Sequence, residues 1–200
     1  MERRHFFRLG LQKALQTVVN GVESGVEQRS AGWFRPPYAQ REMAFLLSCT
    51  RCDRCIQACP HGVLFALPLR VGVRAAATPA MDLLTHGCHL CSDWPCVQVC
   101  EPSALQRPAV ETGAGPPLPR LAQVTIDPGL CLPYQGPECG ACGSVCPIPG
   151  AIHWAGPRPT IVASLCIGCA LCREACVTTP KAVKVQTLRR EPEADSPPPA

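Results

Sequence analysis

The stretch Cys49-Thr-Arg-Cys52-Asp-Arg-Cys55-Ile-Gln-Ala-Cys59-Pro60 places four cysteines within eleven residues. Three later stretches repeat this theme, and we number the four stretches motifs 1 to 4 in chain order. Motifs 2 to 4 read Cys88-x2-Cys91-x4-Cys96-x3-Cys100, Cys131-x7-Cys139-x2-Cys142-x3-Cys146-Pro147 and Cys166-x2-Cys169-x2-Cys172-x3-Cys176. All 16 cysteines of the 200-residue chain lie in these motifs. The spacing of motif 1 is that of a bacterial ferredoxin ligand run, proline included.

Four groups of four cysteines match the ligand demand of four 4Fe-4S clusters, because each cluster needs one soft thiolate per iron. In two-cluster ferredoxins the fourth cysteine of a run ligates the other cluster of the pair. We therefore predict that all sixteen cysteines are iron ligands and that no iron is left for a substrate, so no catalytic residue is expected. The predicted ligands are Cys49, Cys52, Cys55, Cys59, Cys88, Cys91, Cys96, Cys100, Cys131, Cys139, Cys142, Cys146, Cys166, Cys169, Cys172 and Cys176.

Three other kinds of cysteine site fit this pattern less well. Structural zinc sites usually use two C-x2-C pairs separated by a longer loop. Disulfides would give an odd framework from cysteines three residues apart in every motif. A redox C-x-x-C pair accounts for two cysteines, not for sixteen. Histidines near the motifs, such as His61 and His89, are expected outside the ligand set because each site already has four thiolates.

Charge and composition narrow the class of protein further. The formal net charge is +4, but an oxidised cubane with four thiolates carries about −2, so four of them bring the loaded chain to roughly −4. A basic surface for nucleic acid is therefore not expected. No apolar run is long enough for a transmembrane span. With Gly 16 and Pro 23, we expect short regular elements and a chain that is largely unfolded without its clusters.

The N-terminal sequence bears on the cellular compartment. Arg3-Arg4-His5-Phe6-Phe7-Arg8 resembles a twin-arginine export motif. The following residues 9–22 form an amphipathic helical stripe and not the uniform apolar region that an export signal needs. We predict a cytoplasmic protein whose N-terminal helix can associate with a membrane partner, with export to the periplasm as the alternative.

The chain divides into three predicted parts. Residues 1–40 form the leader, the amphipathic helix and an extended lead-in, residues 41–188 form the four-cluster region, and residues 189–200 form a disordered tail. Within the central part, strands are expected at 124–127, 160–162 and 183–185, with a further strand at 67–73 and a helix beginning at Thr78. The predicted fold class is α+β, with two bacterial dicluster-ferredoxin modules of short helices and small antiparallel hairpins around the clusters.

The order of the spacings resembles one family. Motif 2 has four residues between its middle cysteines and motif 3 opens with the seven-residue loop Leu132–Glu138, between standard motifs 1 and 4. Together these features resemble the MauM/NapG ferredoxin-type proteins over residues 35–185, although Val177 stands where a proline often follows the fourth cysteine. The resemblance implies four 4Fe-4S clusters that relay electrons from a membrane quinol dehydrogenase toward a periplasmic acceptor, in systems such as nitrate reduction or methylamine oxidation. An assembly or maturation factor for a partner oxidoreductase is the alternative function.

The resemblance also suggests how the motifs pair. Motif 2 is similar to that of four-cluster subunits of molybdenum oxidoreductases, in which the pairing is nested, motif 1 with 4 and motif 2 with 3. Nested pairing would join Cys49, Cys52 and Cys55 to Cys176, and Cys166, Cys169 and Cys172 to Cys59. It would likewise join Cys88, Cys91 and Cys96 to Cys146, and Cys131, Cys139 and Cys142 to Cys100. Sequential pairing, motif 1 with 2 and motif 3 with 4, is the alternative.

Overall fold

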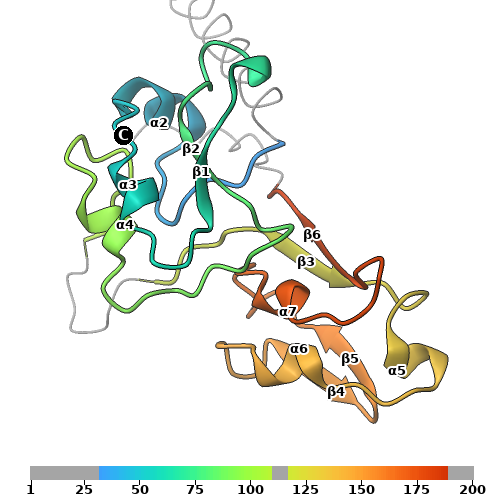
Figure 1. Ribbon diagram of the computed structural model, residues 1–200. Coiled ribbons are helices and arrows are strands. Elements are labelled where there is room, and N and C mark those ends of the chain that lie inside the picture. The colour runs from blue at the N-terminus through green and yellow to red at the C-terminus, as the bar shows by residue number, and fades with distance from the viewer. Residues whose placement is uncertain (1–31, 110–116, 189–200) are drawn as a thin grey trace, which may run out of the picture.

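The computed structural model describes residues 32–109 and 117–188. The predicted leader and amphipathic helix and the predicted disordered tail lie outside these residues. The described part consists of two bodies that follow each other along the chain (Figure 1). We call residues 34–106 module 1 and residues 121–186 module 2.

Module 1 holds motifs 1 and 2. Its elements are α2 (Glu42–Ser48), α3 (Arg54–Gln57), β1 (Leu64–Ala66), η1 (Leu69–Val71), β2 (Pro79–Met81) and α4 (Pro95–Gln98). Strands β1 and β2 pair antiparallel, with Leu64 opposite Met81. The two ends of the module meet at an isolated antiparallel bridge between Ala39 and Leu105. Both motifs are therefore enclosed by a chain segment whose start and end lie side by side.

Module 2 holds motifs 3 and 4 and repeats this plan. Its elements are β3 (Gln123–Ile126), α5 (Leu132–Gln135), α6 (Ala141–Ser144), β4 (Ile152–Ala155), β5 (Arg158–Ile161), α7 (Leu171–Glu174) and β6 (Val183–Gln186). The first and last strands, β3 and β6, pair antiparallel over four residues, and β4 pairs with β5 as a hairpin. Short helices and two-stranded antiparallel sheets in both modules confirm the predicted fold class.

The lead-in to motif 1 is part of the core of module 1. Phe34 is buried and bridges to Met81 of β2. The Tyr38 ring meets the buried Trp94 ring edge-on, with centroids 5.0 Å apart. Arg35 forms a buried ion pair with Glu42 (2.5 Å) and donates to the hydroxyl of Thr78 (2.9 Å). The described residues before position 41 therefore pack as an integral part of the module.

Two secondary-structure predictions for the spacer between motifs 1 and 2 are wrong. The predicted strand at 67–73 is a turn that contains η1, with Leu69 and Val73 exposed to solvent. The predicted helix from Thr78 is strand β2. A proline at the first helical position favours a helix locally, but Pro79, Ala80 and Met81 are all buried and pair with β1. Tertiary pairing outweighs the local signal in this segment. The three predicted strands in module 2 are confirmed as β3, β5 and β6.

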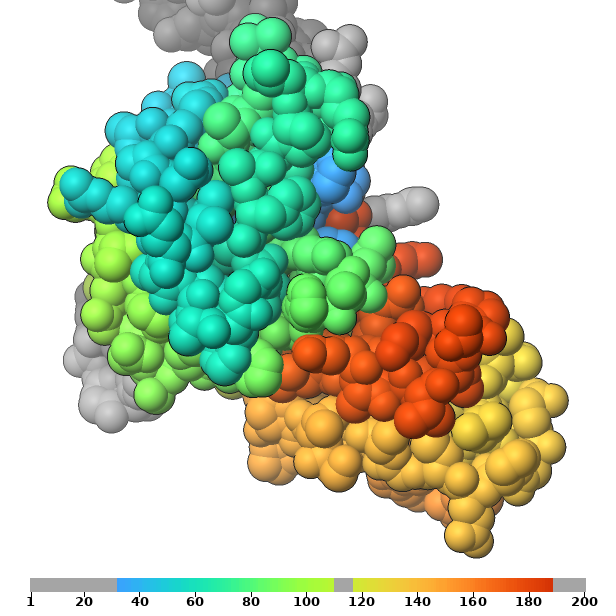
Figure 2. Space-filling view, viewed as in Figure 1, coloured from blue at the N-terminus to red at the C-terminus, as the bar shows by residue number. Residues whose placement is uncertain are grey.

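The modules contact each other through the segment before motif 2 and helix α7. In the space-filling view this green segment abuts the red surface of module 2 (Figure 2). Gly87 lies so close to α7 that an added Cβ would stand 2.7 Å from the Cα of Leu171. In the described part of the chain, no helix has the length and apolar character needed to cross a membrane.

Candidate iron–sulfur sites

The cysteine loops share an unusual backbone conformation. In motifs 1, 2 and 4, the residue just before the second cysteine has a positive φ, at Arg51 (57°), Leu90 (52°) and Gly168 (80°). A second left-handed residue caps the short helix that carries the third cysteine, at Asp53, Trp94 and Ala170. Left-handed backbone costs about 1–2 kcal/mol for a residue with a Cβ. The curl of each loop is therefore held in place by its surroundings.

This curl turns backbone N–H groups toward cysteine sulfurs. Burial raises the pKa of Cys49, Cys88 and Cys166, and in each case the N–H of the left-handed residue two positions later partly offsets that rise. In the same way, the N–H of Arg54 holds the pKa of the exposed Cys52 below its ordinary value. Such N–H···S bonds stabilise a thiolate and are among the features that set cluster potentials.

Motifs 1 and 2 together form two groups of four cysteines. Site 1 consists of Cys49, Cys52 and Cys55 of motif 1 with Cys100 of motif 2. Burial raises the pKa of Cys55 to about 12, and repulsion from Cys49, Cys100 and Cys52 adds to this rise. Site 2 consists of the other members, Cys88, Cys91, Cys96 and Cys59, which line one pocket with Trp94 and Leu64.

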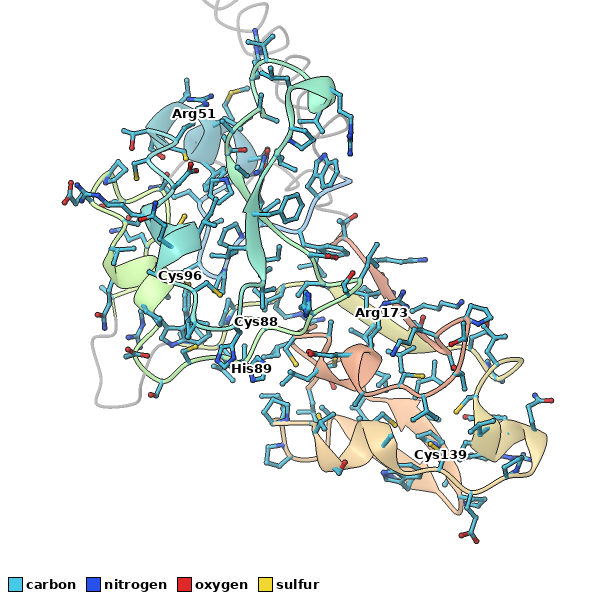
Figure 3. The ribbon with its side chains drawn as sticks, in the orientation of Figure 1. Arg51, Cys88, His89, Cys96, Cys139 and Arg173 are labelled. Carbon is cyan, nitrogen blue, oxygen red and sulfur yellow. The ribbon has the colours of Figure 1, made fainter. Side chains whose placement is uncertain are left out.

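Motifs 3 and 4 form the two corresponding groups in module 2. Site 3 is a pocket lined by Cys131, Cys139 and Cys142 of motif 3 with Cys176 of motif 4. Site 4 is a pocket lined by Cys166, Cys169 and Cys172 of motif 4 with Cys146 of motif 3. Figure 3 labels Cys96 and Cys88 in module 1 and Cys139 in module 2. Every site thus takes three cysteines from one motif and the fourth from its neighbour.

The nested pairing predicted above is wrong for the arrangement of the cysteines. Cys59 lies with Cys88, Cys91 and Cys96 and not with motif 4, whose fourth cysteine Cys176 lies with motif 3. The sequential alternative is the arrangement observed. Its physical reason is that each module closes on itself: β6 pairs with β3, and Leu105 bridges to Ala39. The short helices α3 and α4 then pack together in module 1, and α6 and α7 pack together in module 2.

In the absence of a metal, burial and repulsion between neighbouring cysteines make these thiols harder to deprotonate. Burial raises the pKa of Cys96 and Cys172 to about 12 each, and that of Cys88 and Cys169 to about 11 each. Neighbouring cysteines in the same site add repulsion in all four cases. Cys176 differs, because hydrogen bonds from Thr178 and the N–H groups of residues 182 and 183 outweigh burial and lower its pKa.

The donor sets fit an iron–sulfur cluster better than a single ion. The pockets of sites 2, 3 and 4 are each lined by four cysteines. Their other lining groups are largely apolar, such as Val63, Val183 and Ile167. Among the described residues, no three His, Cys, Asp or Glu side chains converge on the position of one metal ion. Four thiols that surround a space suit a polynuclear cluster, whereas zinc needs its ligands at one centre.

Some residues around the sites were not found by sequence reasoning. The left-handed residues Arg51, Asp53, Leu90 and Trp94 carry no sequence signal, because only Gly168 among these loop positions is a glycine. The rings of His61 and His89 stack at the edge of site 2, with centroids 3.6 Å apart. Each follows a cysteine of that site closely in sequence. Nothing in the sequence, however, indicates that the two rings stack.

Comparison with known proteins agrees with this description. No family model matches the chain. The ferredoxin-type protein NapG of Escherichia coli is 34% identical over 203 residues, which cover 93% of this chain and 86% of that protein. NapG of Haemophilus influenzae is 32% identical, over 92% of this chain and 71% of its own length. The methylamine utilization ferredoxin-type protein MauM of Methylobacillus flagellatus is 30% identical, over 92% and 83%. The resemblance inferred from the motif spacings is therefore confirmed, and the chain belongs to the NapG/MauM ferredoxin-type proteins as an iron–sulfur electron carrier.

Proposed function

We propose that the chain holds four 4Fe-4S clusters, one in each of sites 1 to 4, and relays single electrons between redox partners. The observation that carries this proposal is the exchange of fourth cysteines within each module. Cys59 completes site 2 and Cys100 completes site 1, while Cys146 completes site 4 and Cys176 completes site 3. This exchange is the ligand pattern of two-cluster ferredoxins.

The residues of the chain would contribute ligation, dryness and hydrogen bonds. When bound, a 4Fe-4S cluster supplies a one-electron redox centre. The sixteen thiolates satisfy all sixteen irons of four cubanes, so no iron has an open position for a substrate. The apolar pocket walls limit water access, and the loop N–H groups at Cys49, Cys88 and Cys166 face their sulfurs. Burial and hydrogen bonds of this kind are the means by which a protein sets cluster potentials.

For the partners, we propose a quinol dehydrogenase as the electron donor and a nitrate-reductase-type or related oxidoreductase system as the destination. Family membership supports this choice, because the relatives carry the names NapG and methylamine utilization protein MauM. The proposed partners are proteins. The loaded chain is acidic, and a polyanionic nucleic acid is not an expected ligand.

The cluster count is tested by anaerobic purification. We expect about sixteen irons and sixteen acid-labile sulfides per chain, and uptake of about four electrons on reductive titration. Replacing Cys59 by Ser should remove about four irons, those of site 2, and leave site 1 intact. Replacing Cys100 by Ser should remove the irons of site 1 and leave site 2 intact. Far fewer irons in the unchanged protein would contradict the proposal. Transfer of intact clusters to an apo-acceptor without redox turnover would support the assembly-factor alternative.

The compartment is a separate proposal. The interrupted apolar stretch at 9–22 supports the cytoplasmic prediction, whereas family membership supports the export alternative. Fractionation of cells that carry a tagged chain decides between them, with Arg3 and Arg4 both changed to Lys as the matched control. Retention of both forms in the cytoplasm is the result expected from the apolar stretch. Arrival of only the unchanged form in the periplasm would overturn it.

A further inference from the structure

The contact between the modules is built around two cysteines. The backbone N–H of Cys88 donates to the carbonyl oxygen of Cys169, with an N···O distance of 2.7 Å. Among the described residues, this is the backbone hydrogen bond that joins a cysteine of one module to a cysteine of the other. Cys88 lines site 2 and Cys169 lines site 4. The backbone segments that carry these two sites are therefore in direct contact.

Side chains of module 2 hold this contact from both sides. The N–H of Gly87 donates to the carboxylate of Glu174 (2.7 Å), and the guanidinium of Arg173 donates to the carbonyl of Leu84 (2.9 Å). Figure 3 shows Cys88 at the edge of module 1 that faces Arg173. Gly87 allows the close approach, because a Cβ there would stand 2.7 Å from backbone and side-chain atoms of Leu171. The absence of a side chain at position 87 thus allows sites 2 and 4 to lie close together.

Within each module, the two sites meet through the helices that carry the third cysteines. In module 1, Cys55 of site 1 lies on α3 and Cys96 of site 2 lies on α4, and these helices pack together. In module 2, Cys142 of site 3 on α6 and Cys172 of site 4 on α7 are arranged in the same way. These contacts therefore connect the four sites in a single row, in which each site contacts the next.

From these contacts we infer that electrons pass between the modules from site 2 to site 4 across the Cys88–Cys169 hydrogen bond. The row of sites is then 1–2–4–3, with sites 1 and 3 at its two ends. Each step moves one electron, which oxidises one site by one unit and reduces the next by one. No bond forms or breaks and no proton moves. This inference rests on the proposed function, because it requires a cluster in every site.

The order is tested by removing one site at a time from the anaerobically loaded full chain. Cys52→Ala removes a ligand from site 1 at the end of the row, and the matched variant Cys91→Ala removes one from site 2 inside it. The readout is magnetic coupling between reduced clusters in electron paramagnetic resonance spectra. We expect Cys52→Ala to keep coupling between the modules and Cys91→Ala to lose it. Coupling between the modules that survives Cys91→Ala but not Cys52→Ala would overturn the order.

The contact itself is tested without removing any ligand. Gly87→Ala places a Cβ against α7, and the matched control Gly140→Ala also lies next to a cysteine ligand but has no atom within 4 Å of its added Cβ. We expect Gly87→Ala to keep its iron, to lose coupling between the modules and to speed amide hydrogen exchange at Cys88. Gly140→Ala should change none of these. Full coupling in Gly87→Ala despite faster exchange at Cys88 would overturn the role of the contact.

The iron analysis separates failure of this inference from failure of the proposed function. If the unchanged chain lacks about sixteen irons, the four-cluster function is wrong. If it holds them and shows no magnetic coupling between the modules, the function stands and the inferred row does not.

Discussion

Modules 1 and 2 place their cysteines in the same arrangement, but they are stabilised in different ways. In module 2, the first and last strands form a four-residue antiparallel ladder. In module 1, the corresponding ends meet at the single Ala39–Leu105 bridge. Module 1 compensates with buried side chains: Phe45 is fully buried, and Arg35 pairs with Glu42 and donates to the hydroxyl of Thr78.

The difference shows that the cluster arrangement depends on closing the module and not on one particular means of closing it. Backbone pairing closes module 2, where the strands are continuous. A single backbone bridge with supporting side-chain packing closes module 1, where the spacer between motifs 1 and 2 makes a longer excursion through η1. Substitutions at these contacts should therefore destabilise one module and spare the other.

The largest effect is expected for Glu42→Ala in module 1. Removing one partner of a buried ion pair leaves the Arg35 guanidinium without its counter-charge and costs about 3–5 kcal/mol of stability. We expect guanidinium chloride to bleach the cluster absorbance in two steps, with the module 1 half lost first. The matched control is Lys184→Ala, which removes the half-exposed pair with Asp127 (3.9 Å) in module 2 and should cost at most about 1 kcal/mol. Simultaneous loss of both halves in Glu42→Ala would contradict the separate stabilisation of the modules.

The next effect is expected for Gly168→Ala in module 2. The φ of Gly168 is +80°, and an added Cβ would lie 2.1 Å from the carbonyl oxygen of Ala122. Left-handed strain and overpacking together should lower the stability of module 2 by about 2–4 kcal/mol. Iron retained after a mild denaturant challenge measures the loss. Gly156→Ala shares the positive φ (+61°) but has open space around its Cβ, so a similar loss in both variants would exclude the close approach as the cause.

A smaller effect is expected for Val124→Ala in strand β3. Val124 is buried opposite Val185 of β6, and two buried methyl groups contribute about 1.6 kcal/mol at ~0.8 kcal/mol each. The midpoint of module 2 bleaching should shift to lower denaturant, while that of module 1 stays. Thr125→Ala alters an exposed position of the same strand and serves as the control. An equal shift for both variants would show that packing of the ladder is not the cause.

The smallest effect concerns pH, and it also differs between modules. Burial raises the pKa of Cys55 and Cys96 in module 1 and of Cys172 in module 2 to about 12, from 9.0 for a free thiol. Without clusters these raised values stabilise the folded sites below pH 9, and that contribution is lost between pH 9 and 12. The pH dependence of cluster binding has the opposite sign. Binding becomes more favourable as the pH rises, because thiolates are the ligands and their protons must be released.

Cluster assembly on the cluster-free chain should therefore proceed further as the pH rises from 7 to 9, with uptake of protons by the buffer. Module 1 should respond more steeply, because burial raises the pKa of three of its thiols to about 11 or 12 (Cys55, Cys96 and Cys88), against two in module 2 (Cys172 and Cys169). Iron incorporation followed together with proton release in weak buffer measures both. Incorporation that does not depend on pH would show that the thiols ionise freely before the clusters bind.

Local sequence was sufficient to predict the fold class and the family, and it grouped the candidate ligands into four motifs. Residues such as Cys49, Cys52 and Cys55 are so close in sequence that one loop must present their sulfurs together. The strands in module 2 were also predictable, because β3 and β6 combine β-branched residues with turn residues at their ends. The spacer was not, because Pro79 favours a helix locally while the partner strand β1 lies outside the window that a local pattern covers.

By itself, then, the sequence determined which residues are grouped in each motif, and that the fourth cysteine of a motif belongs with another motif. Only the tertiary structure decided which one. The partner of Cys59 depends on how α3 and α4 pack and on closure of module 1 at Ala39 and Leu105, and these contacts join residues that are far apart in the chain. The same holds for the Cys88–Cys169 hydrogen bond. Spacing acts over a few residues, whereas the order of the four sites depends on which surfaces pack together.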